Sequence, residues 1–174
     1  MDFFGVVSEV IDLRSFSNLW FWIALAVLWS SASHWVMGVP HDMIYRARRV
    51  GGQAEQDVKD IARVYATRIV EVVDTALPFV IGFASFWFTF LGVLAFYYDA
   101  EFAQALFLLM APITIVIWHS IRTARFIRAG GEDAQALFKS LLWHRRVTQL
   151  VGMLAVMVTA FYGMWQNLNA TVLG

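Results

Sequence analysis

The sequence contains no cysteine and few charged residues, and both absences narrow what the chain can be. Without cysteine the chain cannot form disulfides, thiolate zinc sites, cysteine-ligated iron–sulfur clusters or cysteine nucleophiles. Charged residues make up only 15% of the 174 residues, whereas hydrophobic residues make up 60% and aromatic residues 16%. This composition is too apolar for a water-soluble domain and predicts a lipid bilayer as the solvent.

The short patterns of several enzyme classes are also missing. The sequence has no G-x-S-x-G, no Walker loop and no H-E-x-x-H, which are the signatures of many hydrolases, nucleotide-binding enzymes and zinc proteases. No acidic or basic residue is predicted deep within an apolar run, which is unusual for proton-coupled carriers and ion pumps. We therefore predict a protein that is not an enzyme and has no metal site, and these patterns indicate no cofactor.

Four apolar runs approach the length that a helix needs to cross a hydrocarbon layer of about 30 Å. We predict spans at about residues 18–39, 78–98, 102–119 and 147–166. Residues 1–14 predict a short helix at the membrane interface, and residues 53–74 and 132–146 are amphipathic. The fold class is thus all-α, with four transmembrane helices in a single membrane domain covering residues 1–174. The pattern leaves open whether the amphipathic segments lie on the lipid or extend the spans.

Two prolines lie within the predicted spans. Pro78 falls at the start of the second span, where the first helical turn tolerates proline. Pro112 falls in the middle of the third span, where the loss of one backbone hydrogen bond predicts a kink.

Lys and Arg gather in two loops. If residues 40–75 and 120–146 share one side of the membrane, that side holds all of the 13 Lys and Arg residues except Arg14. The positive-inside rule then places both loops in the cytoplasm, and both termini and the turn at Asp99 outside. We predict a multi-pass protein of the cell inner membrane with periplasmic termini.

The two halves of the chain follow the same order of span, basic stretch, Gly-Gly break, amphipathic helix and span. Arg49-Val50-Gly51-Gly52 in the first half corresponds to Arg128-Ala129-Gly130-Gly131 in the second. This internal repeat predicts a tandem duplication of a helical hairpin. Because each unit crosses the bilayer twice, the pseudo-symmetry axis would lie along the membrane normal.

All four histidines are predicted near the cytoplasmic ends of spans. His34 and His119 come from different spans at similar depth, and imidazoles on facing bundle helices can ligate a haem or a metal. Amphipathic aromatic side chains are also ordinary at membrane interfaces. Both interpretations, a cofactor site at His34 and His119 and a structural role, stay open.

Two groups of arginines flank the spans and could bind lipid phosphates or an acidic partner through bidentate hydrogen bonds. They are Arg46, Arg48 and Arg49, and Arg122, Arg125 and Arg128. A topogenic signal combined with lipid contact is the simpler interpretation. We expect no nucleic-acid partner, because these charges lie close to the membrane and the basic stretches continue into acidic residues such as Glu55.

Three stretches carry a family resemblance, namely Ile11 to Trp20, Ser33-His34-Trp35, and Gly38-Val39-Pro40 through to Arg49. They resemble a group of small bacterial polytopic membrane proteins labelled "component of SufBCD complex", over roughly the first third of the chain. The resemblance implies an accessory role in iron–sulfur cluster assembly. It brings no catalytic residues, and this chain has no cysteine with which to carry a cluster.

By elimination, the leading hypothesis is a non-enzymatic accessory or assembly subunit of an inner-membrane complex. Such a subunit would contact membrane lipids and either partner subunits or other copies of itself. One alternative is a redox module that binds haem or quinone. Another is a small homo-oligomeric channel or carrier, in which several copies of a bundle lined by small residues make a pathway that one copy cannot.

Overall fold

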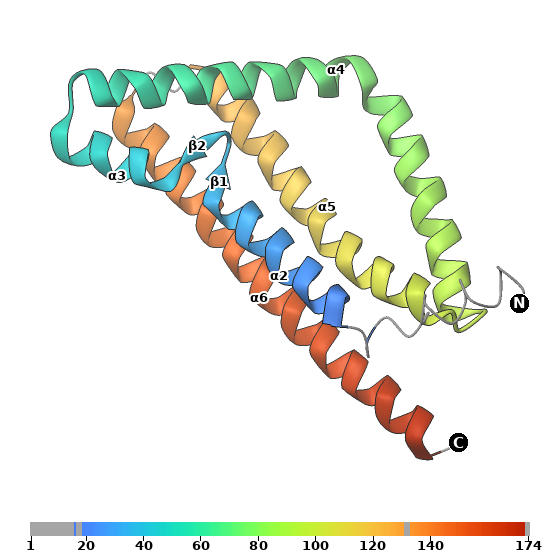
Figure 1. The fold of residues 1–174 in the computed structure, drawn as a ribbon. Helices are drawn as coiled ribbons and strands as arrows, with labels where there is room; N and C mark the ends of the chain where they lie inside the picture. The colour runs from blue at the N-terminus through green and yellow to red at the C-terminus, as the bar shows by residue number, and fades with distance from the viewer. Residues whose placement is uncertain (1–15, 17–18, 131–132, 173–174) are drawn as a thin grey trace, which may run out of the picture.

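The computed structural model describes residue 16, residues 19–130 and residues 133–172 (Figure 1). Within them the chain forms five helices, which are α2 (Leu19–His34), α3 (His41–Val50), α4 (Gln53–Phe96), α5 (Glu101–Arg128) and α6 (Ala134–Val172). Strands β1 (Trp35–Val36) and β2 (Val39–Pro40) form a hairpin between α2 and α3. The interfacial helix expected at residues 1–14 lies outside the described residues.

Three of the described helices, α4, α5 and α6, are long and apolar enough to cross a membrane. The second half of α4 and the whole of α6 run antiparallel to α5, as the short connections between them require (Figure 1). α2 is also apolar and lies antiparallel beside α6, but it has only 16 residues. At about 1.5 Å per residue its length is about 24 Å, which is less than a hydrocarbon layer of about 30 Å.

The first apolar run ends as a helix earlier than the expected boundary at residue 39. Helix α2 stops at His34, and the next six residues form the hairpin, with Trp35 opposite Pro40 and Val36 opposite Val39. The turn between the strands has Met37 at φ 52° and Gly38 at φ 72°, which is the left-handed backbone of a tight hairpin turn. Because the residue before a proline is driven out of the helical region, Pro40 also prevents a helix from running through Val39.

Helix α4 joins the first amphipathic segment to the second apolar run without a break. It begins after Gly51 and Gly52, both at positive φ, and continues for 44 residues to Phe96. Figure 1 shows that it bends sharply near its middle, where Pro78 lies inside the helix. The proline has no N–H to donate to the carbonyl of Asp74 and its ring crowds that carbonyl, which accounts for the bend. Residues 53–74 therefore extend the apolar limb at an angle to it.

Helices α5 and α6 are each continuous through an apolar and a basic part. α5 contains Pro112, yet Figure 1 shows no bend in it comparable with that in α4. The neighbours explain the difference, because α5 packs on α2 and α6 through Leu109 and Ile113 and on α4 through Met110. These contacts on two sides hold the axis of α5, whereas the residues after Pro78 in α4 are exposed.

The largest core lies at the basic end of the molecule. We call this end the head; it comprises α3, residues 53–74 of α4, residues 120–128 of α5 and residues 134–146 of α6. Its buried side chains come from all four segments and from the hairpin, and they are Met37, Val39, Ile44, Ala47, Val58, Ala62, Ala66, Val70, Ala124, Ile127, Leu137, Phe138 and Leu141. The stripe on α4 recurs every fourth residue and includes two alanines, which lets the neighbouring helices approach closely.

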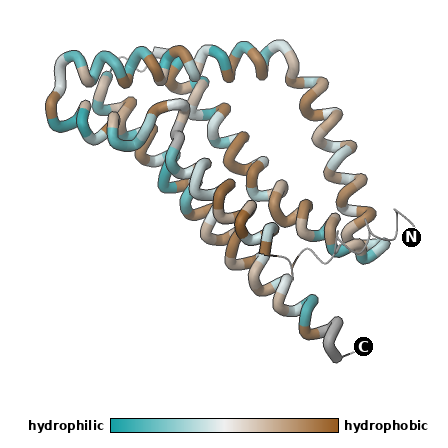
Figure 2. Tube along the Cα trace, in the orientation of Figure 1, coloured by the Kyte–Doolittle hydropathy of each residue, from teal (hydrophilic) through white to brown (hydrophobic). Residues whose placement is uncertain are grey.

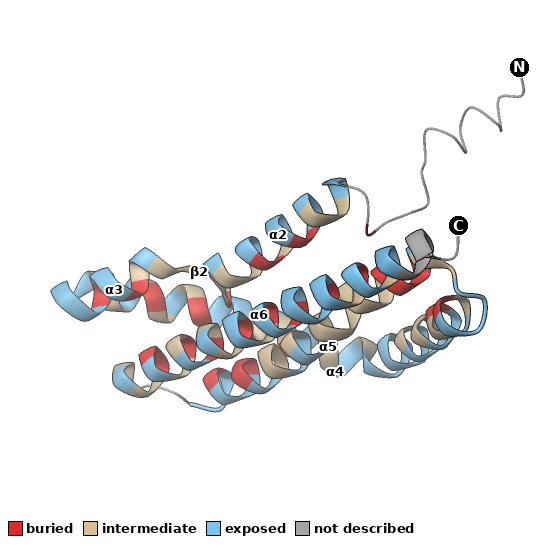
Figure 3. Cartoon of the chain, turned by 90° about the horizontal axis from the view of Figure 1, so that it is seen from below, coloured by how far each residue is buried: buried red, intermediate tan, exposed pale blue. Residues whose placement is uncertain are grey.

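The remaining, apolar part of the molecule has smaller cores. One joins α2, α5 and α6 around Leu25, Trp29 and Ala155, and another joins α4 and α5 around Leu91, Ala95 and Ala103. Figure 2 shows that the helices are predominantly hydrophobic here, in contrast to the mixed head. Figure 3 shows exposed residues along the outer faces of the same helices. Exposed apolar surface of this extent fits a hydrocarbon solvent.

Candidate functional site

Two histidines from different helices stack face to face where α5 and α6 pass each other near the head. The rings of His119 and His144 have centroids 4.8 Å apart and planes within 6° of parallel. His144 is almost fully buried, with 4% of its surface exposed. Among the side chains that are buried in the described part of the chain, His144 is the one that can ionise. This pair is therefore the candidate site that the geometry singles out.

Two hydroxyl groups of α5 hold the ring of His144. Ser120 Oγ lies 3.3 Å from Nε2, and Thr123 Oγ1 lies 3.2 Å from Nδ1. Ser120, Thr123 and His119 all lie within about one turn of α5, so one short segment supplies both hydroxyls and the stacking partner. On α6, Thr148 Oγ1 donates to the carbonyl oxygen of His144 at 3.0 Å. The two hydroxyls of α5 thus hold both ring nitrogens, whereas the Thr148 hydroxyl engages the backbone of His144 and not its ring.

The hydrogen bonds around the ring of His144 are compatible with two protonation states. Ser120 Oγ also reaches the carbonyl oxygen of Val116 at 2.9 Å, and Thr123 Oγ1 that of His119 at 3.0 Å. If both hydroxyl protons go to those carbonyls, both oxygens can only accept from the ring, and the ring must carry two N–H groups and a positive charge. If His144 is neutral, one hydroxyl turns its proton to the ring. The two hydroxyls can therefore accommodate either protonation state.

His119 has an unused donor or acceptor. Its Nε2 is buried and has no hydrogen-bond partner among the described residues. A buried polar atom without a partner costs about 1–3 kcal/mol. Because parallel rings direct their nitrogen lone pairs along parallel planes, the pair does not converge on one metal ion between the rings. Among the described residues no group of three or more His, Cys, Asp or Glu is placed to hold a metal.

The structure places the predicted site residue His34 at the last position of α2, where it is exposed. It brings the other predicted residue, His119, against His144. His144, Ser120 and Thr123 were missed as site residues by the sequence reasoning. The spacing of the two histidines could have indicated their contact. His119 and His144 lie at nearly equal distances in sequence on either side of the Gly130-Gly131 break, and two antiparallel helices place such positions side by side.

The two arginine groups have different surroundings. Arg125 Nη2 lies 3.7 Å and Arg128 Nη1 lies 3.6 Å from the two carboxylate oxygens of Asp74, beside the bend of α4. All three side chains are about half exposed, so these ion pairs contribute little stability. Arg122, Arg46 and Arg49 are exposed. Arg48 lines a groove in the head. Their contact with lipid or with a partner stays a prediction.

A second polar cluster lies at the end of the bundle opposite the head. Gln104 of α5 is 2% exposed and donates from Nε2 to the carbonyl oxygen of Ala95 in α4 at 2.8 Å. Gln166 of α6 donates from Nε2 to Gln104 Oε1, also at 2.8 Å. These bonds tie three helices together and satisfy the buried amide. The cluster therefore has a structural role.

The described residues line at least two open surface grooves. One, of about 940 Å³, lies in the head between the junction of α3 with α4 and the start of α6. The other, of about 620 Å³, lies between α2 and α6 and is lined mainly by apolar side chains such as Trp29, Met153 and Val156. The indole nitrogen of Trp29 is buried without a described partner. Comparison with family models, curated proteins and solved structures found no match for this chain.

Proposed function

We propose that this chain is a non-enzymatic accessory or assembly subunit of a bacterial inner-membrane complex. The observation that supports this best is the isolated first half of the apolar limb of α4. Phe79 is 81% exposed, Phe83 68% and Phe86 67%, and a Cβ built on Gly82 would meet no atom within 4 Å. The bend at Pro78 and the head together direct this segment away from α5, so its surface is available to another helix.

The isolated segment also has the composition that helix pairing in lipid requires. Because lipid tails are as apolar as leucine, helices in a bilayer associate through close packing and interhelical hydrogen bonds, and small residues allow close approach. Gly82, Ser85 and Thr89 fall on one side of α4 and are exposed. A helix of a partner subunit, laid along this side, would complete the bundle.

The topology that we propose with this function has four spans, namely α2, the apolar limb of α4, α5 and α6. The head carries nearly all of the Lys and Arg residues, and the positive-inside rule favours its placement in the cytoplasm and both termini in the periplasm. The proposed duplication would pair α2 with the apolar limb of α4, and α5 with α6. The β1–β2 hairpin between α2 and α3 has no counterpart within the continuous helix α5, so the two units would have diverged at this point.

The test is purification of the tagged chain from its own membrane in mild detergent, with co-purifying proteins identified by mass spectrometry. We expect stoichiometric recovery of one membrane complex. The double variant Gly82→Leu/Ser85→Leu should reduce that recovery at least about tenfold, a loss of about 1.4 kcal/mol. The matched control Ala24→Leu/Ala160→Leu adds the same bulk at exposed positions of α2 and α6 and should leave recovery unchanged.

Two results would overturn the proposal. One is recovery of the chain alone from its native membrane, which would direct attention to flux through a homo-oligomer in liposomes. The other is a Soret band in the purified protein that is lost in His34→Ala, which would establish the redox alternative instead.

A further inference from the structure

The groove in the head has an unusual balance of charge. Three basic side chains line it, Arg48 from α3 and Lys139 and Arg146 from α6, together with two acidic ones, Glu55 and Asp133. None of the three basic side chains has an ion pair within the described part of the chain. Cations that line a cavity without a counter-ion favour an anionic ligand.

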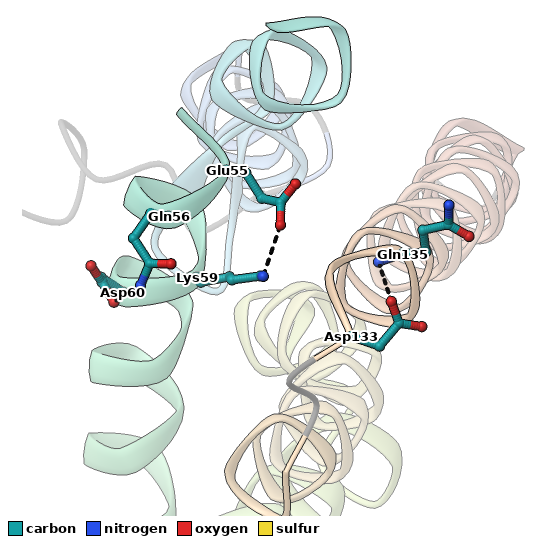
Figure 4. A network of polar contacts seen from close by, with 6 residues as sticks. All are labelled: Glu55, Gln56, Lys59, Asp60, Asp133 and Gln135. Atoms are coloured by element: carbon teal, nitrogen blue, oxygen red, sulfur yellow. Dashed lines mark hydrogen bonds and ion pairs between the residues drawn. The ribbon is translucent and has the colours of Figure 1, made fainter. Parts of the chain in front are cut away.

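The two acids of the groove are already engaged, as Figure 4 shows. Glu55 Oε1 lies 2.8 Å from Nζ of Lys59, one turn along α4. Asp133 Oδ1 accepts a hydrogen bond from the backbone N–H of Gln135 at 3.1 Å, at the start of α6. Glu55 is paired with a cation outside the groove lining, whereas Asp133 is hydrogen-bonded but keeps its negative charge. Arg48, Lys139 and Arg146 therefore outnumber the acid without an ion pair by three to one, which leaves the groove positively charged.

The position of the groove along α6 indicates what kind of anion it would meet. Lys139, Trp143 and Arg146 lie at four- and three-residue spacing and so share one face of the helix. Trp143 is 58% exposed, and the apolar run of α6 begins directly after Arg146. A basic and tryptophan-bearing face at the end of a span lies at the level of lipid headgroups. The groove also has an apolar wall that includes Phe138 and Leu142.

We propose that this groove binds the phosphate headgroup of an anionic membrane lipid. Arg48 and Arg146 would bind the phosphate oxygens through their guanidinium groups, and Lys139 would add a point charge. Trp143 and the apolar wall would contact the glycerol region and the start of an acyl chain. A basic pocket between helices at the cytoplasmic surface is a known way of recognising such headgroups. The site requires only that the head lie at the membrane surface, and it is independent of the accessory role.

Native mass spectrometry of the full chain in detergent, with phosphatidylglycerol added, tests the proposal. We expect one tightly bound lipid per chain, with phosphatidylcholine at least about tenfold weaker, because its choline cation opposes the basic side chains. The variant Arg48→Gln/Lys139→Gln/Arg146→Gln should weaken the tight site at least about tenfold. The control Arg63→Gln/Arg68→Gln removes two charges at exposed positions that neither line the groove nor belong to the arginine groups predicted to contact lipid, and it should change the affinity less than about twofold.

Three outcomes would overturn the proposal. An equal loss of affinity for each charge removed, in the groove variant and in the control variant, would mean that binding is diffuse electrostatic attraction. Equal binding of phosphatidylcholine would mean that the charges do not select the lipid. Displacement of phosphatidylglycerol by a modest excess of inorganic phosphate would mean that the ligand is free phosphate. The single variant Arg48→Gln, at an exposed position, keeps the test decisive if the triple variant does not fold.

Discussion

The turn at Met37 and Gly38 shows how a single residue can fix the connection between two helices. Gly38 has φ 72°, and a Cβ there would overlap the ring of Tyr65 in α4. Gly51 has a similar φ of 67°, but a Cβ there would meet nothing within 4 Å. Alanine is strained at both positions, and more so at Gly51, whose φ of 67° and ψ of −158° lie in a region open essentially to glycine alone. Gly38→Ala should lower the thermal unfolding temperature in detergent through backbone strain and through the overlap with Tyr65, whereas Gly51→Ala should lower it through backbone strain alone.

The excess cost at Gly38 should come from the ring of Tyr65. We expect Tyr65→Ala, introduced into the Gly38→Ala protein, to restore much of the lost unfolding temperature, while the strain from φ remains. If Tyr65→Ala does not raise the unfolding temperature of the Gly38→Ala protein, the tyrosine ring moves aside at little cost.

The hydroxyl of Thr123 is expected to matter more than a typical threonine hydroxyl of the same helix. Thr123→Val keeps the shape of the side chain but leaves Nδ1 of the buried His144 without its partner, which costs about 1–3 kcal/mol. The control is Thr114→Val, since Thr114 is exposed and its hydroxyl bonds only the carbonyl oxygen of Ala111. Intrinsic fluorescence during thermal unfolding in detergent measures both. If the Thr114 variant is as unstable as the Thr123 variant, the hydrogen bond from Thr123 to His144 has no special importance for stability.

At the scale of single residues, the sequence predicted which residue types could form a site better than it predicted which of them contact one another. The histidines were expected near one end of the spans, but only the packing of α5 on α6 reveals that His119 meets His144. The exposed position of His34 depends on where α2 ends, which in turn depends on the hairpin. Relations of this kind arise from helix rotation and register, which apolar periodicity alone does not determine.

At the scale of helices, the bend of α4 is the feature with the clearest test. Pro78→Ala restores the donor for the carbonyl of Asp74 and should straighten α4. Because the sequence contains no cysteine, spin labels attach only to cysteines that are introduced. We choose the exposed positions Arg63 and Val93, one on each limb of α4. In a straight helix these positions would be about 45 Å apart. We expect the measured label distance to increase towards that value in the alanine variant.

The matched control for the bend is Pro112 of α5. Labels at the exposed positions Phe102 and Phe126 should give the same distance before and after Pro112→Ala, because contacts on both sides already hold that helix straight. An unchanged distance in the Pro78 variant would mean that packing of the head, and not the proline, sets the bend.

The positions of the helices could be predicted from the sequence where the apolar runs were long. The three helices that are long and apolar enough to span a membrane lie where the second, third and fourth runs were predicted, although their boundaries extend well beyond those runs. The kink expected at Pro112 is weak and the bend at Pro78 is strong, because the effect of a proline depends on the neighbours that support the helix. The hairpin at residues 35–40 was missed, since Gly38 and Pro40 lie at the end of an apolar run that was assigned as one span.

For the whole molecule, the arrangement of charge predicts which end faces the cytoplasm. Single cysteines at Arg49 in the head and at Tyr98 in the turn before α5 would both be exposed on the protein. In intact cells, a membrane-impermeant thiol reagent should label Tyr98→Cys and should label Arg49→Cys only after permeabilisation, because the positive-inside rule holds the basic head in the cytoplasm. The reverse labelling pattern would mean that the head lies in the periplasm and the turn before α5 in the cytoplasm.

The same assay decides whether α2 crosses the membrane. Leu19 begins α2 at the end away from the head and is 71% exposed. If α2 is the fourth span, Leu19→Cys should be labelled from outside as readily as Tyr98→Cys, because a helix of about 24 Å brings its first residue close to the far surface, where the bilayer can thin locally to match it. If only three helices cross, Leu19→Cys should stay unlabelled in intact cells, because Leu19 would then lie within the membrane or on the cytoplasmic side. Labelling of both cysteines would establish that the short α2, packed antiparallel on α6, completes an even number of crossings.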